Sequence, residues 1–150
     1  MGVLTEAVIR LARPADAGRL REIARAARGH WGYDADRVAA WAAELPLAPA
    51  RDRWVAEMGD EIVAWAEIEP PHDGVCTLEA LWVDPAWMRR GIGARLFRVA
   101  ADRARELGAR TLEWGTEPPA VGFYERLGAR RIGEHPGEWV DLVPVMGIDL

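Results

Sequence analysis

The spacing of apolar residues along the chain predicts an alternation of strands and helices. Leu20, Ile23, Ala24 and Ala27 recur at helical spacing, whereas residues 62–68 form an apolar run of strand length. The same reasoning predicts strands at residues 8–12, 53–57, 62–68, 75–83, 111–114, 131–133 and 142–150, and helices at residues 14–29, 36–45, 91–107 and 120–127. The order β-α-α-β-β-β-α-β-α-β-β is typical of an α+β or mixed α/β fold.

The longest predicted helix, residues 91–107, has one apolar face. That face is formed by Gly93, Phe97, Ala100, Ala104 and Leu107. The opposite face is formed by Arg95, Arg98, Asp102 and Arg105. With 150 residues, 50% of them apolar and 29% charged, the chain has the size and balance of a single globular domain over residues 1–150.

The charged residues exclude several kinds of chemistry. All 19 basic residues are arginines, so a Walker A loop and a lysine Schiff base are both excluded. The net charge of −5 argues against a broad nucleic-acid-binding surface.

Cys76 is the single cysteine, which excludes an internal disulfide and a cysteine-rich zinc site, and no metal is expected. Without a signal-peptide run or a membrane-spanning stretch, we expect a cytoplasmic protein.

The most informative segment is the turn between the strand at 75–83 and the long helix. The strand closes at Asp84-Pro85, two arginines follow at 89 and 90, and Gly91-Ile92-Gly93 opens the helix. The first N–H groups of a helix have no partner within the helix, and its macrodipole is positive there. Such a turn favours a bound phosphate. A Rossmann fingerprint is excluded, because no third glycine follows at the required spacing and the motif is not at the first strand.

These features, with the later segment Gly-Phe-Tyr-Glu-Arg-Leu-Gly-Ala at 122–129, make the chain similar to the GCN5-related N-acetyltransferase (GNAT) family. The similarity extends over residues 8–150 and is most specific at 78–133. It implies a central, mostly antiparallel sheet of six to seven strands, splayed in the middle and flanked by four helices. It also implies acetyl-CoA as the cofactor and an amine of a small molecule or peptide as the acceptor, and it admits a homodimer.

The resemblance also assigns cofactor-binding residues. Backbone amides of the turn would bind the pyrophosphate of acetyl-CoA, and the pantetheine arm would lie along the strand end. The cofactor-binding residues that the resemblance assigns are Leu81, Trp82, Val83, Arg89, Arg90, Gly91, Ile92, Gly93, Ala94 and Phe123. Two departures bear on cofactor affinity: Met88 replaces the family's usual Arg or Gln, and Glu117-Pro118-Pro119 replaces a segment that often holds an Asn.

Two residues are candidate acid–base groups. Tyr124 matches the family tyrosine that protonates the departing thiolate, and this role is favoured over the alternative, a core tyrosine beside Phe123 with a satisfied hydroxyl. Glu79 shares a strand face with Leu81 and Val83 and occupies the position of a base in some members. A solvated strand carboxylate explains Glu79 as well.

Trp31 and Tyr33 lie in the loop that shapes the acceptor pocket in the family, where function and packing explain them equally well. The favoured function is an N-acetyltransferase that transfers the acetyl group directly in a ternary complex. The alternatives are a non-catalytic acyl-CoA-binding or sensing module on the same fold, and an interaction domain whose Gly-x-Gly merely starts a helix.

Overall fold

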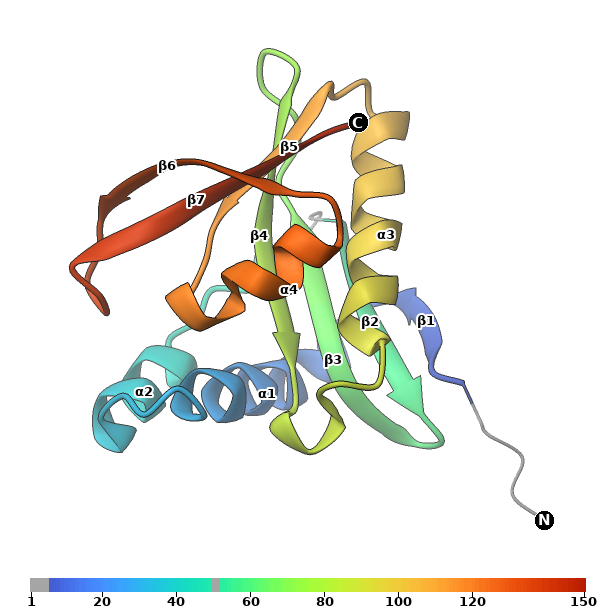
Figure 1. Ribbon diagram of the computed structural model, residues 1–150. Coiled ribbons are helices and arrows are strands. Elements are labelled where there is room, and N and C mark those ends of the chain that lie inside the picture. The colour runs from blue at the N-terminus through green and yellow to red at the C-terminus, as the bar shows by residue number, and fades with distance from the viewer. Residues whose placement is uncertain (1–5, 50–51) are drawn as a thin grey trace. The chain divides into compact units, whose positions relative to one another are not determined.

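The computed structural model describes residues 6–49 and 52–150. Its strands are β1 (Val8–Leu11), β2 (Asp52–Met58), β3 (Glu61–Ile68), β4 (Val75–Val83), β5 (Thr111–Gly115), β6 (Arg130–Pro136) and β7 (Leu142–Asp149). Its α-helices are α1 (Ala17–Gly29), α2 (Ala35–Ala43), α3 (Ile92–Glu106) and α4 (Val121–Arg126) (Figure 1). Every predicted strand and helix is present, so the mixed α/β prediction is confirmed. Three short 3-10 helices, each beginning with a proline, were not predicted: Pro14–Asp16, Pro85–Trp87 and Pro118–Ala120.

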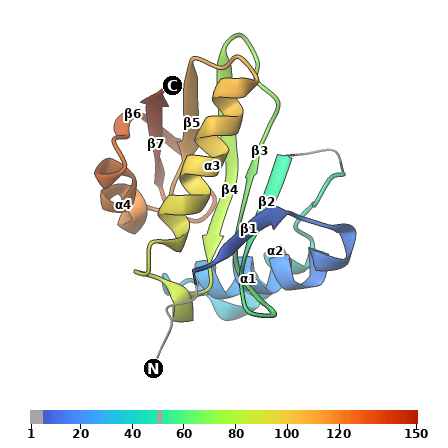
Figure 2. The same cartoon turned by 90° about the vertical axis from the view of Figure 1, so that its right-hand side faces the viewer.

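The strands follow the order β1-β2-β3-β4-β5-β7-β6 in one seven-stranded sheet. β1 pairs antiparallel with β2 (Figure 2), and β7 pairs antiparallel with both β5 and β6. β4 and β5 are parallel. The described residues form two compact units: unit 1 comprises residues 1–67, as far as they are described, with Ala80–Arg98, and unit 2 comprises Ile68–Glu79 with Val99–Leu150.

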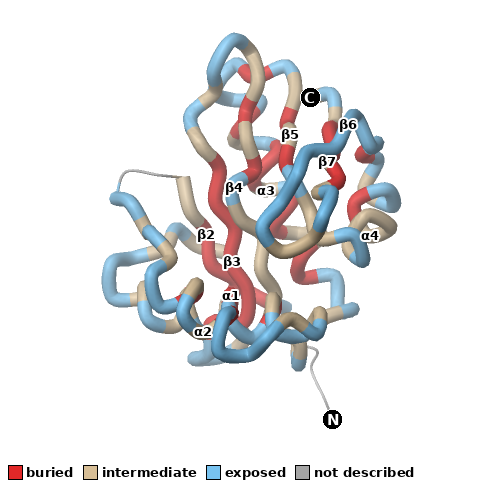
Figure 3. Tube along the Cα trace, turned by 90° about the vertical axis from the view of Figure 1, so that its left-hand side faces the viewer, coloured by how far each residue is buried: buried red, intermediate tan, exposed pale blue. Residues whose placement is uncertain are grey.

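The core of unit 1 forms where α1 covers the buried strands β2 and β3 (Figure 3). The apolar stripe predicted for α1 is buried and packs against Val55, Ile62 and Trp65. The indole N–H of Trp65 donates to the carbonyl of Leu20 at 2.9 Å, so this buried polar atom is satisfied. These contacts confirm the helical face that the sequence predicted.

Unit 2 is organised around β5 and β7. Leu112 of β5 pairs with Ile148, and Trp114 pairs with Met146. Leu112, Trp114 and Met146 are buried, whereas every residue of β6 is exposed. The prediction for Leu107 is wrong, because the helix ends at Glu106 and Leu107 is 37% exposed.

Among the described residues, none of the helices combines the length and the apolar character that a membrane crossing requires.

An ion pair beside β1 gives the fold a predictable response to acid. The guanidinium of Arg10 bonds both carboxylate oxygens of Asp16, at 2.9 and 3.2 Å, and also contacts Glu57. This hydrogen bonding by Arg10 lowers the pKa of Asp16 below its ordinary value of 3.8. The unfolded chain therefore binds the proton more readily, and the contribution of Asp16 to stability, fully present above pH 4, is lost as the pH falls through the folded pKa.

We therefore expect Asp16→Asn to lower the free energy of unfolding by about 1 kcal/mol at pH 7, the scale of a charged hydrogen bond in a partly exposed site. The difference from the unmodified protein should shrink as the pH falls from 4 to 2, as measured by urea unfolding at each pH. A difference that stays constant over that range would contradict the assignment to Asp16.

Candidate functional site

The final part of β4 lies beyond the ladder that joins β4 to β5. The parallel register ends at Thr77, which pairs with Glu113, whereas β4 continues to Val83. Leu81, Trp82 and Val83, which belong to unit 1, are all half-buried.

Asp84 fixes the backbone as it leaves β4. Its N–H donates to the carbonyl of Val63 at 2.8 Å, and its carbonyl accepts the N–H of Trp87 at 2.8 Å. Its carboxylate accepts the N–H of Ala86 at 3.0 Å and a guanidinium N–H of Arg19 of α1, also at 3.0 Å. The half-buried carboxylate of Asp84 thus joins the start of the turn to α1.

The backbone of the turn adopts a conformation that leaves its amides without protein acceptors in the described part of the chain. Arg89 has φ +64° and Gly91 has φ +80°, while Arg90 between them does not share a positive φ. Within the described residues, the N–H groups of residues 89–94 have no protein acceptor; the first helical bond runs from the N–H of Arg95 to the carbonyl of Gly91, at 3.1 Å. Successive amides in such alternating conformations form an anion-binding concavity.

The local charge and space favour an anion at this turn. Arg89, Arg90 and Gly91 are exposed, and a Cβ added at Gly91 would meet nothing within 4 Å. The turn also begins α3, so the positive end of its macrodipole lies here. A helix start with these properties favours a bound anion, so the assignment of these amides to a phosphate stays a prediction.

In unit 2, Tyr124 of α4 is held in an aromatic cluster. Its ring centroid lies 4.9 Å from that of Trp114 and 5.0 Å from that of Phe123, and the residue is only 6% exposed. A side-chain hydrogen bond joins Tyr124 to Thr116, just beyond β5. Burial raises the pKa of Tyr124 above its ordinary value of 10.0, and the smaller effect of Thr116 lowers it. The hydroxyl is therefore protonated at neutral pH and can act as a proton donor.

Glu79 lies on β4 in unit 2 and is exposed, between Leu78, which is buried, and Ala80. The alternation along β4 places it on the face opposite Cys76 and Leu78. The structure thus keeps Glu79 in contact with solvent, where a carboxylate can exchange a proton with water or with a bound amine. Phe123 is half-buried beside Tyr124.

Trp31 and Tyr33 lie in the connection between α1 and α2, in unit 1. Both are half-buried, and the ring of Trp31 meets that of His30 edge to face at 5.0 Å. A second cluster in the same unit was not predicted from the sequence. There the guanidinium of Arg28 lies over the rings of Trp41, at 4.1 Å, and Trp82, at 5.1 Å.

Arg28, Trp41 and Trp82 come from elements distant in the sequence, so no local pattern could have found this cluster. Arg19 and Thr116 were missed for the same reason: the first reaches Asp84 from α1, and the second reaches Tyr124 from the end of β5. Asp84 itself had a local signal, because an Asp before a proline is a common cap of a short helix. Across residues 6–49 and 52–150, no group of three or more His, Cys, Asp or Glu side chains could hold a metal ion.

The family model described as the acetyltransferase (GNAT) family matches residues 18–129, so the chain belongs to the GNAT family. Among curated proteins, it is 29% identical over 90 residues to YjgM of Escherichia coli strain K12, an uncharacterized N-acetyltransferase. This match covers 56% of the chain, and the chain spans only about half (54%) of that relative.

Solved structures show the same fold. A GCN5-related N-acetyltransferase from Rhodopseudomonas palustris superposes with a TM-score of 0.81 at 21% identity, covering 100% of this chain and 99% of that one. The PaiA N-acetyltransferase from Thermoplasma acidophilum, solved in complex with coenzyme A, has a TM-score of 0.77 at 14% identity, with 97% and 100% covered.

Proposed function

We propose that residues 1–150 act as one acetyl-CoA-dependent N-acetyltransferase domain, which moves an acetyl group to a primary amine of a small molecule or peptide. The observation that carries the proposal is the turn at residues 89–94, which is exposed at residues 89–91, has amides without a protein acceptor among the described residues, and has positive φ at Arg89 and Gly91. Membership of the GNAT family and the coenzyme A complex of PaiA support the same cofactor.

The residues present fit coenzyme A. The open amides at 89–94 suit its diphosphate, because a Cβ-free Gly91 leaves room for close approach of the backbone. The backbone of residues 81–83, which lies beyond the ladder to β5, has polar groups for the amide-rich pantetheine arm, and Phe123 supplies an apolar surface. When bound, acetyl-CoA supplies the activated acyl group.

The chain's own residues then provide positioning and proton transfer. In the proposed mechanism a neutral amine attacks the thioester carbonyl, and a backbone N–H near Val83 polarises that carbonyl. The carbon–nitrogen bond forms as the carbon–sulfur bond breaks. Tyr124 donates its proton to the departing thiolate, and Glu79 accepts the proton lost by the amine, directly or through water. The proton that Tyr124 gives to the thiolate is balanced by the proton that Glu79 takes from the amine. Because the amine attacks the thioester directly, no acyl-enzyme forms.

The acceptor would lie against the connection between α1 and α2, where Trp31 and Tyr33 offer half-buried aromatic surfaces. Aromatic rings suit an amine because their faces attract a cation. Positioning both substrates is expected to contribute more than either proton transfer, up to about 7–11 kcal/mol in well-aligned cases.

Two measurements test the proposal. Calorimetry with coenzyme A asks whether the chain binds the cofactor, and no binding would overturn it. Release of free thiol from acetyl-CoA is then followed with a panel of amino acids, polyamines, aminoglycosides and peptides. Turnover with one amine class supports an enzyme, whereas binding without turnover for every amine would favour the acyl-CoA-sensing alternative.

Loss of the Asp84 carboxylate should weaken cofactor binding. Asp84→Ala removes the acceptor of both the Ala86 N–H and the Arg19 guanidinium. Because a hydrogen bond to a charged group contributes about 1.5–3 kcal/mol, we expect the Kd for coenzyme A to rise by about tenfold. Glu22→Gln is the matched control, since Glu22 is an exposed partner of the same arginine, at 3.4 Å. An equal effect of both variants would show that the turn does not depend on Asp84.

A further inference from the structure

One arginine and two tryptophans of unit 1 form a cluster that gives a positive charge a fixed position. The guanidinium carbon of Arg28, in the last turn of α1, lies 4.1 Å from the centroid of the Trp41 ring on α2 and 5.1 Å from that of Trp82 on β4. The two rings meet edge to face at 5.5 Å, and all three residues are half-buried. Because both rings lie within the range of a cation–π contact, α2 and β4 together position the Arg28 charge.

The cluster lies on one face of β4, and the proposed cofactor contacts lie on the other. Trp82 packs against the buried core that contains Leu20 of α1. Side chains alternate along a strand, so Leu81 and Val83, the proposed contacts of the pantetheine arm, point away from α1. Since the cofactor would occupy that face, the face that carries Arg28 is left for the acceptor.

Arg28 is also joined to the connection that is proposed to hold the acceptor. Its carbonyl accepts the N–H of Trp31 at 3.2 Å, and α1 ends one residue later, at Gly29. Through its backbone Arg28 thus contacts the residue proposed to meet the amine, and through its side chain it reaches Trp82, next to the proposed site of the thioester. A group bound at Arg28 would therefore belong to the acceptor.

The chemistry of the cluster selects the charge of that group. A guanidinium stacked on aromatic faces keeps its N–H donors at its edges. It has five donors, so a carboxylate that takes two of them can be bound alongside other partners. A fixed positive charge also attracts an anion and repels a second cation.

We propose that Arg28 binds a carboxylate of the acceptor, so that the acceptor is a small amine that also carries a carboxylate, as an amino acid does. The inference rests on the proposed function and names its substrate class. Polyamines and aminoglycosides, which carry several positive charges and no carboxylate, are poor acceptors on this inference.

The test compares each of a panel of amino acids with its own carboxamide as the acceptor. The two forms differ in the carboxylate, and the amine of the carboxamide is less basic, so its neutral fraction is larger and the chemistry alone favours the carboxamide. Thiol release at saturating acetyl-CoA gives kcat and KM for both forms, and polyamines and aminoglycosides are included. The proteins are the unmodified chain, Arg28→Gln and Arg28→Lys.

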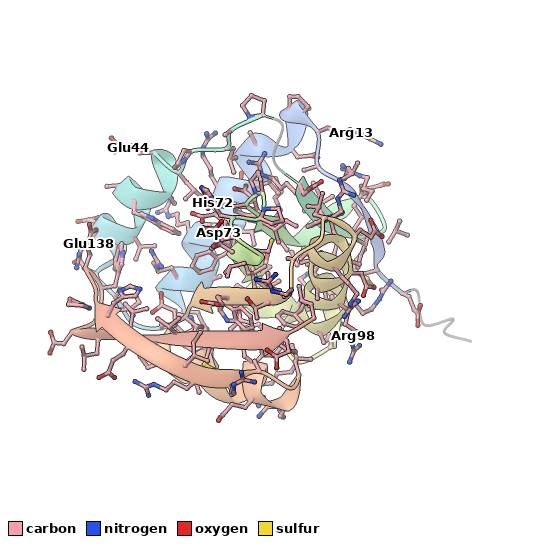
Figure 4. The ribbon with its side chains drawn as sticks, turned by 90° about the horizontal axis from the view of Figure 1, so that it is seen from above. Arg13, Glu44, His72, Asp73, Arg98 and Glu138 are labelled. Atoms are coloured by element: carbon pink, nitrogen blue, oxygen red, sulfur yellow. The ribbon has the colours of Figure 1, made fainter. Side chains whose placement is uncertain are left out.

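Two further variants control for the loss of one positive charge. Arg25→Gln removes an exposed arginine of α1, about one turn before Arg28. Arg98→Gln removes an exposed arginine of α3 (Figure 4). Neither residue belongs to the cluster, so both variants should keep the full preference for the carboxylate.

We expect the unmodified protein to use an amino acid with a kcat/KM about tenfold above that of its carboxamide, the scale of one charge-assisted contact. Arg28→Gln should lose this preference because the KM for the amino acid rises by about the same factor, while the carboxamide is used as before. Arg28→Lys should keep part of the preference, since lysine retains the charge but cannot form the paired contact.

A carboxamide used as well as its amino acid by the unmodified protein would overturn the inference and leave the proposed function standing, as would turnover confined to polyamines or aminoglycosides. A preference that survives in Arg28→Gln would overturn it too, and so would an equal loss of activity with both forms, which indicates a structural role. If no amine is acetylated, the proposed function and this inference both fail. If Arg28→Gln does not fold, the paired comparison in the unmodified protein and in Arg28→Lys decides the matter.

Discussion

Tyr124→Phe is expected to lower kcat by roughly 10²–10⁴-fold, the usual contribution of general acid catalysis, while the KM for acetyl-CoA changes little. The substitution removes only the hydroxyl, and the ring contacts with Trp114 and Phe123 remain. The fold should therefore be preserved, and the loss should appear in the chemical step. The measurement is steady-state thiol release with the amine that the panel identifies.

The raised pKa of Tyr124 predicts how kcat depends on pH. Because burial raises the pKa of Tyr124 above 10.0, the group stays protonated through the physiological range. An acid of this kind causes no loss of kcat on the alkaline side until the pH exceeds that ordinary value. In Thr116→Val, which removes the hydrogen bond that lowers the pKa, any alkaline decline should move to still higher pH.

Thr116→Val also serves as the structural control, because it alters the surroundings of Tyr124 and keeps the hydroxyl. It should retain far more activity than Tyr124→Phe. Undiminished turnover in Tyr124→Phe would falsify the acid assignment and leave Tyr124 as a core residue. Equal losses in the two variants, with lowered thermal midpoints, would point to packing instead.

Arg53→Met is expected to destabilise the fold by about 3–5 kcal/mol, the cost of leaving a buried charge without its partner. The Nε of Arg53 lies 2.6 Å from a carboxylate oxygen of Glu67, and the two side chains are only 12% and 7% exposed. Arg53 also donates to the carbonyl of Ala48 at 3.0 Å. Urea unfolding followed by circular dichroism measures the change.

A double substitution separates the ion pair from the packing. In Arg53→Met with Glu67→Leu, no charge is left buried, so most of the lost stability should return. Arg105→Met is the matched control: its pair with Asp102 is exposed, 57% and 68%, and breaking it should change stability by less than about 1 kcal/mol. A double variant no more stable than Arg53→Met would show that the arginine stabilises through its stem and not its charge.

The sequence predicted most of the candidate site because its parts are local. The turn at 84–94 combines a strand end, a proline and two glycines, whose backbone preferences act locally. The φ of +80° at Gly91 agrees with this pattern, whereas the φ of +64° at Arg89 could not be predicted, because residues other than glycine rarely adopt a positive φ. The register of β4 against β5 was not predicted, since strand pairing depends on residues far apart in the chain.

Long-range partners were decided by the tertiary structure alone. Leu107 has the right periodicity for the apolar face of α3 but falls just past the end of the helix. Arg95, assigned to the opposite face, is half-buried and donates to the carbonyl of Ala7 at 2.6 Å. Glu67 is the one charged residue in the predicted apolar run 62–68, and its burial is accompanied by an ion pair with Arg53, which lies on another strand.

The sequence by itself determined the order of elements, the mixed α/β class and the glycine-containing turn before α3, because periodicity, capping residues and backbone preferences act over a few neighbouring positions. The tertiary structure decided which side chains meet: Arg19 with Asp84, Thr116 with Tyr124, and Arg28 with two tryptophans. Such pairs depend on the folded path of the backbone, which brings together residues that no local pattern connects.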